Sequence, residues 1–302
     1  MTGKTLPFVS VIIPVLNGER TIRDCLVSLL RMDYPPDRRE LVVVDNGSTD
    51  RTAEIIKCYP VAYVWEGKRG VSYARNRGIR ASQAEILAFT DADCMVTTRW
   101  LGELTEGFDS DDVGVVVGEV VAYPPKTRAQ RHTAMRRPLW QTSALSHPAT
   151  PWFTSANAAF RREVFTKLGL FDHRFAGAGA EDIDFSWRFL QDRHFELRYR
   201  PKATVLHRHR ASTRELFQQR KVYGQGQAIL CRKYPKELSW GWSQELRAYK
   251  DLLLTALALV QAAMQTRLRG LGAPEGNFLY VELVRKLGER IGFIYGTVQR
   301  ST

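Results

Sequence analysis

Residues 86–93 read Ile-Leu-Ala-Phe-Thr-Asp-Ala-Asp. The apolar residues 86–90 are typical of a short buried β-strand. Asp91 and Asp93 follow, and side chains two residues apart in an extended segment point to the same side. Two carboxylates this close repel each other, so we expect a cation between or beyond them. Oxygen ligands of this kind suit Mg²⁺ or Mn²⁺, although an isolated Asp-x-Asp also closes many strands as a solvated turn.

Strands and helices alternate before this stretch. Apolar, partly β-branched runs predict strands at 8–15, 41–44 and 61–65, and apolar residues at helical spacing predict a helix at 21–32. A second helix is expected at 51–58. This order predicts an α/β protein with a mostly parallel central sheet, in which ligands bind at the carboxyl ends of the strands.

Polar clusters follow three of these strands, at Asn17-Gly18, Asp45–Asp50 and Asp91–Asp93. They are therefore expected to lie on one rim of the sheet. No Gly-x-Gly-x-x-Gly follows the first strand, and the chain contains no P-loop motif, which argues against a dehydrogenase or a P-loop nucleotidase. Acidic strand ends suit a metal that neutralises phosphates. The Asp45 cluster by itself is equally compatible with a helix-capping turn.

The second half contains a strand-like run at 113–123 and then a long polar and basic connection at 124–151. A connection of this length is more often functional than structural. Residues 153–160 are small or polar around Asn157, which suits close contact with a ligand. Gly-Ala-Gly-Ala at 177–180 is flexible enough for a hinge or lid.

Two further groups can carry chemistry. Glu181-Asp182 begins a predicted helix, where the helix dipole favours acidic residues, so this position needs no catalytic explanation. His207 ends another predicted strand, at 203–206, and an imidazole near carboxylates can complete a metal site. Spacing alone does not separate His207 from His209.

These motifs, in this order, resemble glycosyltransferase family 2, whose members have the GT-A fold. The resemblance spans roughly residues 8–212. Its matching pieces are Val9–Asn17, Asp45–Asp50, Gly70 with Ala74-Arg75-Asn76, Asp91-Ala92-Asp93, and Glu181–Asp184 followed by Arg188.

The resemblance implies a role for each matched residue on the donor side. Pro14 and Asn17 would line the nucleotide pocket, and Asp45 would accept a hydrogen bond from the base. Arg75 would lie near the nucleotide, and Asp91 near the ribose or the metal.

It also implies the reacting groups. Asp93 and His207 would bind Mn²⁺ or Mg²⁺ at the diphosphate, Asp182 would be the general base, and Glu181 would help to orient the acceptor. We place Asn157 in the nucleotide-sugar site as well. In an inverting transfer the acceptor hydroxyl loses its proton as it attacks, so one carboxylate must lie within hydrogen-bond reach.

Processive synthases of this family carry a Gln-x-x-Arg-Trp motif and several membrane spans. Residues 217–224 give only Phe-Gln-Gln-Arg-Lys-Val-Tyr-Gly, without the tryptophan. We therefore expect transfer of a single sugar. Arg220 remains open as a diphosphate contact or as part of a solvated helix face.

The net charge of +12 comes entirely from residues 198–302, which carry 19 Lys and Arg against 7 Asp and Glu. We expect a GT-A domain at 1–212 and a basic helical region at 213–302, which could meet phospholipid, nucleic acid or a polyanionic substrate. The apolar residues 252–264 are too few to span a bilayer and are typical of a buried helix. Residues 277–299 would form an amphipathic helix on anionic lipid, or one packed on its neighbour or a second subunit.

Four widely spaced cysteines without a Cys-x-x-Cys pair fit a reducing compartment. Residues 1–7 lack a signal-peptide core, so we expect a cytoplasmic protein, associated with the inner face of the membrane if its acceptor is lipid-linked.

The sequence thus predicts a metal-dependent inverting glycosyltransferase. It would move one sugar from a UDP-, GDP- or dTDP-sugar to a polysaccharide or lipid-linked hydroxyl, in the synthesis of cell-surface polysaccharide or glycolipid. A sugar nucleotidyltransferase is the rival enzyme, but it would need a Gly-rich basic loop after Pro14. A nucleic-acid-binding or anionic-surface-binding protein is the other alternative. The chain shows no helix-turn-helix, zinc-finger or aromatic RNA-binding motif, and we expect no nucleic-acid partner.

Overall fold

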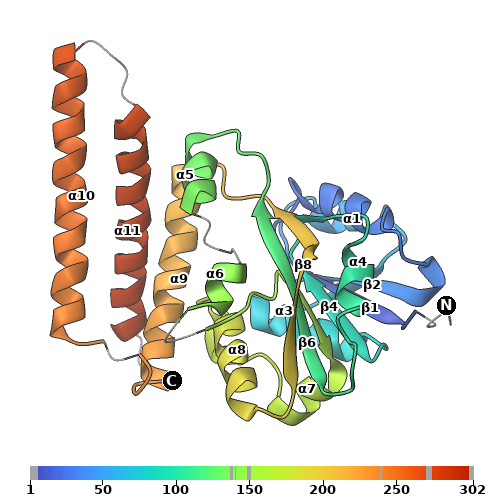
Figure 1. Cartoon of the computed structure of the whole chain (residues 1–302). Coiled ribbons are helices and arrows are strands. Elements are labelled where there is room, and N and C mark those ends of the chain that lie inside the picture. The colour runs from blue at the N-terminus through green and yellow to red at the C-terminus, as the bar shows by residue number, and fades with distance from the viewer. Residues whose placement is uncertain are drawn as a thin grey trace. The chain divides into compact units, whose positions relative to one another are not determined.

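The computed structural model (Figure 1) describes residues 6–136, 139, 141–147, 151–238, 240–269 and 274–298. The chain divides into two compact units. The first contains residues 1–123, 139–177 and 181–207, and the second contains residues 124–138, 178–180 and 208–302. The connection at 124–138 therefore groups with the C-terminal residues.

The first unit alternates strands and helices in the predicted order. Its elements are β1 (Val9–Val15), α1 (Ile22–Leu30), η1 (Pro36–Arg38), β2 (Arg39–Asp45), α2 (Thr52–Ile56), β3 (Ala62–Trp65), α3 (Val71–Ala81), β4 (Ile86–Thr90), β5 (Cys94–Val96), α4 (Trp100–Thr105), β6 (Val113–Ala122), α6 (Gln141–Leu145), β7 (Asn157–Arg161), α7 (Arg162–Leu168), η2 (His173–Phe175), α8 (Glu181–Asp192) and β8 (Glu196–His207).

The strands form one mixed sheet in the order β3-β2-β1-β4-β7-β6-β8-β5. β1, β2, β3 and β4 are mutually parallel, as are β6 and β8, whereas β7 and β5 run antiparallel to their neighbours. The α/β fold with a mostly parallel sheet is therefore confirmed. The carboxyl ends of β1, β2 and β4 share one edge, where the three polar clusters begin.

Both faces of the sheet are buried, which explains why its strands read as continuous apolar runs. In β1, Val11 and Ile13 belong to the core cluster on the α1 side, whereas Ile12 belongs to the opposite cluster. The opposite cluster is rich in aromatic rings, among them Phe89 and Phe160, whose centroids lie 5.5 Å apart nearly edge to face. This two-sided core fixes the strand ends that carry the polar groups.

Some elements escaped the sequence analysis. The connection at 124–151 is not a plain loop, because it contains α5 (Arg128–Arg136) and α6. β8 begins at Glu196, well before the expected strand at 203–206, and the short strand β5 follows Asp93 directly. Residues 148–150 of the connection lie outside the described residues.

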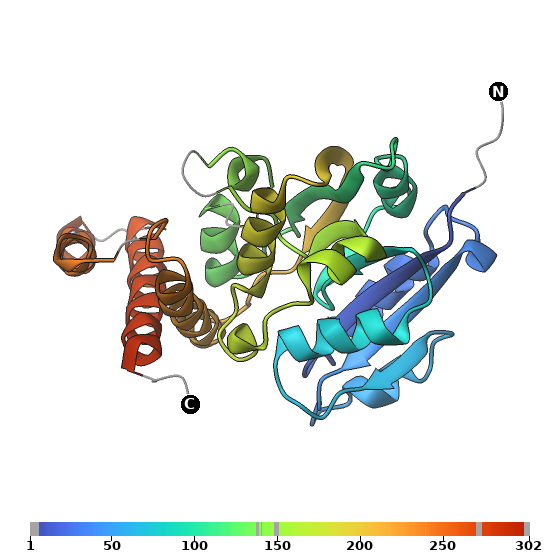
Figure 2. The same ribbon diagram turned by 90° about the horizontal axis from the view of Figure 1, so that it is seen from below.

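The second unit consists of α5 with three long helices, α9 (Thr213–Lys233), α10 (Trp242–Arg269) and α11 (Pro274–Val298). α11 runs along α9 at very close range (Figure 2). A Cβ added to Gly292 would lie 1.9 Å from the carbonyl oxygen of Lys221, and one added to Gly224 would lie 2.1 Å from that of Glu289. Glycine is thus required on both helices. Of the three placements left open for residues 277–299, the structure shows packing on a neighbouring helix, with Gln299 outside the described residues.

The assignment of residues 252–264 to a buried helix was wrong. Only one face of α10 packs against α11, where Thr255 and Ala262 are buried. Leu253 and Leu257 on the other face are 60% and 56% exposed. A thirteen-residue run with only two polar residues, Thr255 and Gln261, looks the same in sequence whether one side of the helix is covered or both. None of the helices within the described residues is long and apolar enough to cross a membrane.

Arg220 is also not on a solvated helix face. It is buried, and its guanidinium lies 3.1 Å from the Glu289 carboxylate. Glu289 in turn lies 2.6 Å from Arg285, which also pairs with Glu282 at 2.7 Å. Arg220 is therefore one member of an ion-pair network between α9 and α11.

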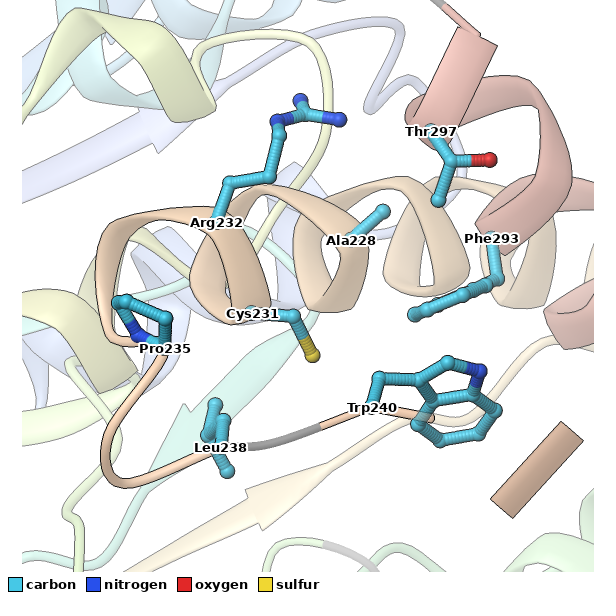
Figure 3. A pocket seen from close by; sticks show the side chains of 8 residues that line it. All are labelled: Ala228, Cys231, Arg232, Pro235, Leu238, Trp240, Phe293 and Thr297. Atoms are coloured by element: carbon cyan, nitrogen blue, oxygen red, sulfur yellow. The ribbon is translucent and has the colours of Figure 1, made fainter. Parts of the chain in front are cut away.

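The helical unit also contains a pocket of about 390 Å³ near the end of α9. Trp240 and Phe293 line it, with ring centroids 4.4 Å apart, and the Cys231 thiol points into it (Figure 3). None of the residues that line this pocket belongs to the predicted site.

Candidate active site

The loops after β1 and β2 are locked together by hydrogen bonds. The backbone N–H of Asn17 donates to the Ser48 hydroxyl at 2.9 Å, and the Asn17 amide oxygen accepts from the backbone N–H of Thr49 at 2.8 Å. Asn17 has a left-handed backbone, with φ of 51°, which a non-glycine residue adopts at some cost. The hydrogen bonds from the loop after β2 stabilise this strained backbone, and the Asn17 side chain is exposed at the edge of the sheet.

Asp45 lies at the end of β2 and is only 2% exposed. One carboxylate oxygen accepts from the Ser48 N–H at 2.9 Å, and the other accepts from the Tyr63 hydroxyl at 2.9 Å. Each carboxylate oxygen of Asp45 can accept one more hydrogen bond, and the two existing donors fix the orientation of the carboxylate. Pro14 is buried within β1, opposite Val44 of β2.

Arg75 joins two parts of the site that are far apart in sequence. It projects from α3, is buried, and lies 3.0 Å from Asp91 at the end of β4. Its other terminal nitrogen pairs with Glu181 at the start of α8. Asn76, on the same helix, exchanges two hydrogen bonds with the backbone of Phe171, at 2.8 and 3.0 Å. α3 therefore holds the strand end and the segment leading to α8 in one arrangement.

A glycine makes this arrangement possible at the start of α3. Gly70 has a φ of 134°, and an added Cβ would lie 2.4 Å from the side chain and the carbonyl oxygen of Ala176. Only glycine fits this close approach without moving the backbone.

The cluster around Arg75 contains more acid than base. Against the cost of burial, the charges of Glu181, Asp91 and Asp182 raise the pKa of Arg75, so it stays protonated. Burial and the charge of Glu181 raise the pKa of Asp182 to about 7, with Asp91 adding to the effect and Arg75 opposing it. One oxygen of Glu181 is buried without a hydrogen-bond partner. Asp182 is thus a carboxyl group balanced between its two protonation states near neutral pH.

A candidate metal centre begins two residues after Asp91, at Asp93. Ligand atoms of Asp93, Cys94 and His207 all lie within 4.8 Å of one another, and the His207 imidazole is 3.4 Å from the Asp93 carboxylate. Strand register produces this proximity, because His207 of β8 pairs directly with Cys94 of β5. His209, which spacing left open, is not part of this group.

These donors fit a divalent cation of the Mn²⁺ type. Carboxylate and imidazole are suitable ligands for such an ion. Burial, followed by the charges of Asp93 and Asp91, raises the pKa of the Cys94 thiol well above its ordinary value. Because only a thiolate ligates metal well, Asp93 and His207 are the stronger candidates.

Asn157 begins β7 and pairs with Thr90 of β4, the residue before Asp91. Its side chain is fully buried in the sheet, where the amide oxygen accepts from the Trp100 indole at 2.7 Å. The amide nitrogen donates to the carbonyls of Glu119 and Ala203, at 2.8 and 2.7 Å. Both ends of the amide are therefore occupied by protein atoms.

Sequence reasoning missed Cys94 and Tyr63. Cys94 follows Asp93 immediately, but its place opposite His207 depends on a strand pairing that joins distant segments. Tyr63 lies in the predicted third strand, and its contact with Asp45 could have been suspected from the parallel pairing of adjacent strands.

The fold and the acidic rim together define a protein of the GT-A class. A family model described as "Glycosyl transferase family 2" matches residues 10–169. The chain therefore belongs to glycosyl transferase family 2.

Similar proteins agree with this assignment. The glycosyltransferase AglE of Haloferax volcanii is 33% identical over 203 residues, which cover 62% of this chain and 66% of that protein. The probable glycosyltransferase YdaM of Bacillus subtilis is 29% identical over 247 residues, covering 76% and 58%. The chain thus spans less than two thirds of the length of these relatives.

Among solved structures, the mannosyltransferase PcManGT of Pyrobaculum calidifontis, in complex with GDP-Man and Mn²⁺, has the same fold. Its TM-score is 0.63 at 22% identity, and the match covers 96% of this chain and 87% of that one.

Proposed function

We propose that the chain is a metal-dependent inverting glycosyltransferase that moves one sugar from a nucleoside-diphosphate sugar to a hydroxyl acceptor. The observation that carries this proposal is Arg75, which joins Asp91 on the donor side to Glu181 beside the base. Arg75 and Glu181 are 106 residues apart and are held in one charged cluster with Asp91, which precedes Asp93 of the candidate metal site by two residues.

Asp182 is the proposed general base. In the transfer, the acceptor oxygen forms a bond to the anomeric carbon while the bond from that carbon to the diphosphate oxygen breaks. The hydroxyl proton passes to Asp182, so no covalent enzyme intermediate is needed. A pKa of about 7 leaves Asp182 ionised in part of the population near neutral pH and makes it a stronger base than an ordinary aspartate.

Glu181 and Arg75 set the conditions for this proton transfer. The negative charge of Glu181 favours the protonated form of Asp182, and the positive charge of Arg75 limits that effect. Glu181 would also orient the acceptor through the buried oxygen that has no partner.

Asp93 and His207 would hold Mn²⁺ or Mg²⁺, which when bound supplies Lewis-acid stabilisation of the leaving diphosphate. PcManGT, which has the same fold, is in complex with GDP-Man and Mn²⁺, which supports a metal and a nucleotide-sugar donor here. On the nucleotide side, Asn17 and the fixed Asp45 would contact the nucleoside, with Asp45 accepting from the base. Pro14 would shape the floor of this pocket from within the sheet.

The donor is proposed to be a UDP-, GDP- or dTDP-sugar, and the acceptor a polysaccharide or lipid-linked hydroxyl at the inner face of the membrane. Transfer of a single sugar is favoured because residues 217–224 lack the tryptophan of the processive motif. A sugar nucleotidyltransferase is disfavoured, since the loop after β1 offers only Asn17-Gly18 in place of a Gly-rich basic loop.

The test is release of nucleoside diphosphate from a panel of UDP-, GDP- and dTDP-sugars, with Mn²⁺ and then with EDTA. We expect slow hydrolysis of one donor that requires metal and is lost in Asp93→Ala. Asp111→Ala is the matched control, because that carboxylate is fully exposed and far from the site in the fold. If no donor is cleaved, binding of each nucleotide-sugar to the protein is measured by calorimetric titration in the presence of Mn²⁺. Failure of every nucleotide-sugar to bind would overturn the proposal.

A further inference from the structure

The helical unit exposes an apolar face on α10 that the proposed chemistry does not use. Seven apolar side chains on this helix are each more than half exposed, Leu254 among them, and the other six follow one another at helical spacing. These six are Trp242, Leu246, Leu253, Leu257, Val260 and Met264, referred to here as the α10 stripe. At 1.5 Å per residue, the stripe is about 33 Å long.

The α10 stripe is not the side on which the helix packs. Thr255 and Ala262 are buried on the side that meets α11. Figure 2 shows α10 nearly end-on, with α11 between it and α9. Single exposed apolar residues are common, but a continuous stripe of six marks a surface that meets another phase or molecule.

The charges on α10 are arranged asymmetrically. Its acidic residues Glu245 and Asp251 are paired with cations of α11, Glu245 with Arg290 and Asp251 with Lys286 at 2.7 Å. The exposed Arg247 and the exposed Lys250 have no carboxylate partner within the described part of the chain. The exposed side of α10 is therefore apolar and positively charged.

We propose that the α10 stripe binds the surface of an anionic lipid bilayer, with the helix lying in the plane of the interface. The apolar side chains would enter the boundary between headgroups and acyl chains, and Arg247 and Lys250 would meet lipid phosphates.

Charge complementarity selects lipid over the other occupants. In a dimer formed through this face, Arg247 and Lys250 of one copy would approach the same face of the other. The two acids of that helix, Glu245 and Asp251, are already paired with α11 and would not neutralise them. Nucleic acid would satisfy the cations but would leave the stripe in water. An anionic bilayer satisfies both features. This inference goes beyond the proposed function and does not depend on it.

Co-sedimentation with vesicles tests the proposal. The full chain is mixed with vesicles of phosphatidylcholine alone and with vesicles that also contain phosphatidylglycerol. We expect binding to the second kind only, weakened by added salt, and weakened at least roughly tenfold in the Leu253→Glu/Leu257→Glu variant. Met135→Glu is the matched control, because Met135 is 71% exposed but lies on α5, and it should bind like the wild type.

A second variant, Arg247→Gln/Lys250→Gln, keeps the test valid if the leucine variant fails to fold by circular dichroism. It should lose the preference for phosphatidylglycerol while donor hydrolysis stays unchanged. The proposal is overturned if the wild type does not bind phosphatidylglycerol vesicles, or if neither variant weakens binding. It is equally overturned if the stripe instead supports a concentration-dependent dimer that the leucine variant abolishes. Donor hydrolysis is measured beside each binding assay. It shows whether the proposed glycosyltransferase function holds, whatever the result for vesicle binding.

Discussion

The two units each contain a cluster of buried charges, and the clusters are built in opposite ways. Around Arg75, three carboxylates surround one cation, and burial with the charge of Glu181 raises the pKa of Asp182 to about 7. In the helical unit, Glu282 lies 2.8 Å from His132 and 2.7 Å from Arg285. Although burial opposes it, hydrogen bonds from these two residues and the nearby positive charges lower the pKa of Glu282 below its ordinary range.

The difference separates a reactive site from a structural one. A carboxyl group with a raised pKa is costly to ionise and is a better proton acceptor, which is useful in catalysis and unfavourable for stability. A carboxylate with a lowered pKa is neutralised by its partners and contributes to folding at neutral pH. Removing Asp182 should therefore affect activity, and removing Glu282 should affect stability.

The largest expected effect is that of Asp182→Asn on sugar transfer. Loss of the general base should lower the transfer rate by about 10²- to 10⁴-fold once an acceptor is supplied, while donor affinity changes little. Asp192→Asn, at the other end of α8, is the matched control and should remain active. If Asp182→Asn transferred sugar at a rate near that of the wild type, Asp182 would not be the general base.

Next in size is the effect of Glu282→Ala on the free energy of unfolding. Buried cations would lose their partner, at a cost of about 3 kcal/mol in urea denaturation. Because the pKa of Glu282 is lowered in the folded state, its contribution is present above the ordinary pKa of glutamate and is lost as the pH falls below it. The difference in the free energy of unfolding between the wild type and Glu282→Ala should therefore become smaller at acidic pH. The control variant Glu237→Ala, in an exposed turn, should have the same free energy of unfolding as the wild type.

A smaller effect is expected from Gly292→Ala. The added methyl would meet the Lys221 carbonyl oxygen and push α11 away from α9, lowering the free energy of unfolding by about 1–3 kcal/mol. Gly276→Ala is the control, since nothing lies within 4 Å of its added Cβ. Equal thermal stability of the two variants would contradict the close packing of α9 and α11.

Much of the fold could be predicted because buried parallel strands have continuous apolar runs with abrupt polar ends. Asp91 and Asp93 follow directly from the strand at 86–90, and the register of β8 then places His207 beside Asp93. The positions of these two acids depend on local chain direction, which sequence reveals.

What the sequence could not reveal depends on distant partners. Asn157 stays a predicted ligand contact, and its hydrogen bonds to Trp100 and two backbone carbonyls join segments that sequence does not show to be close. The apolar run at 252–264 looks buried, but only one neighbour, α11, covers it. The sequence left Arg220 open as a diphosphate contact or a solvated residue, because its partner Glu289 lies 69 residues away in the chain.

The most direct test of the proposed base is the pH dependence of kcat/KM for sugar transfer, measured for the wild type and for Glu181→Gln. Protonation of Asp182 should remove activity as the pH falls, with an acid limb near pH 7 in the wild type. Removing the negative charge of Glu181 lowers the pKa of Asp182, so the limb of Glu181→Gln should move to lower pH. Glu85→Gln, an exposed control, should keep the wild-type profile. A limb that stays in place in Glu181→Gln would contradict the assignment of Asp182 as the base.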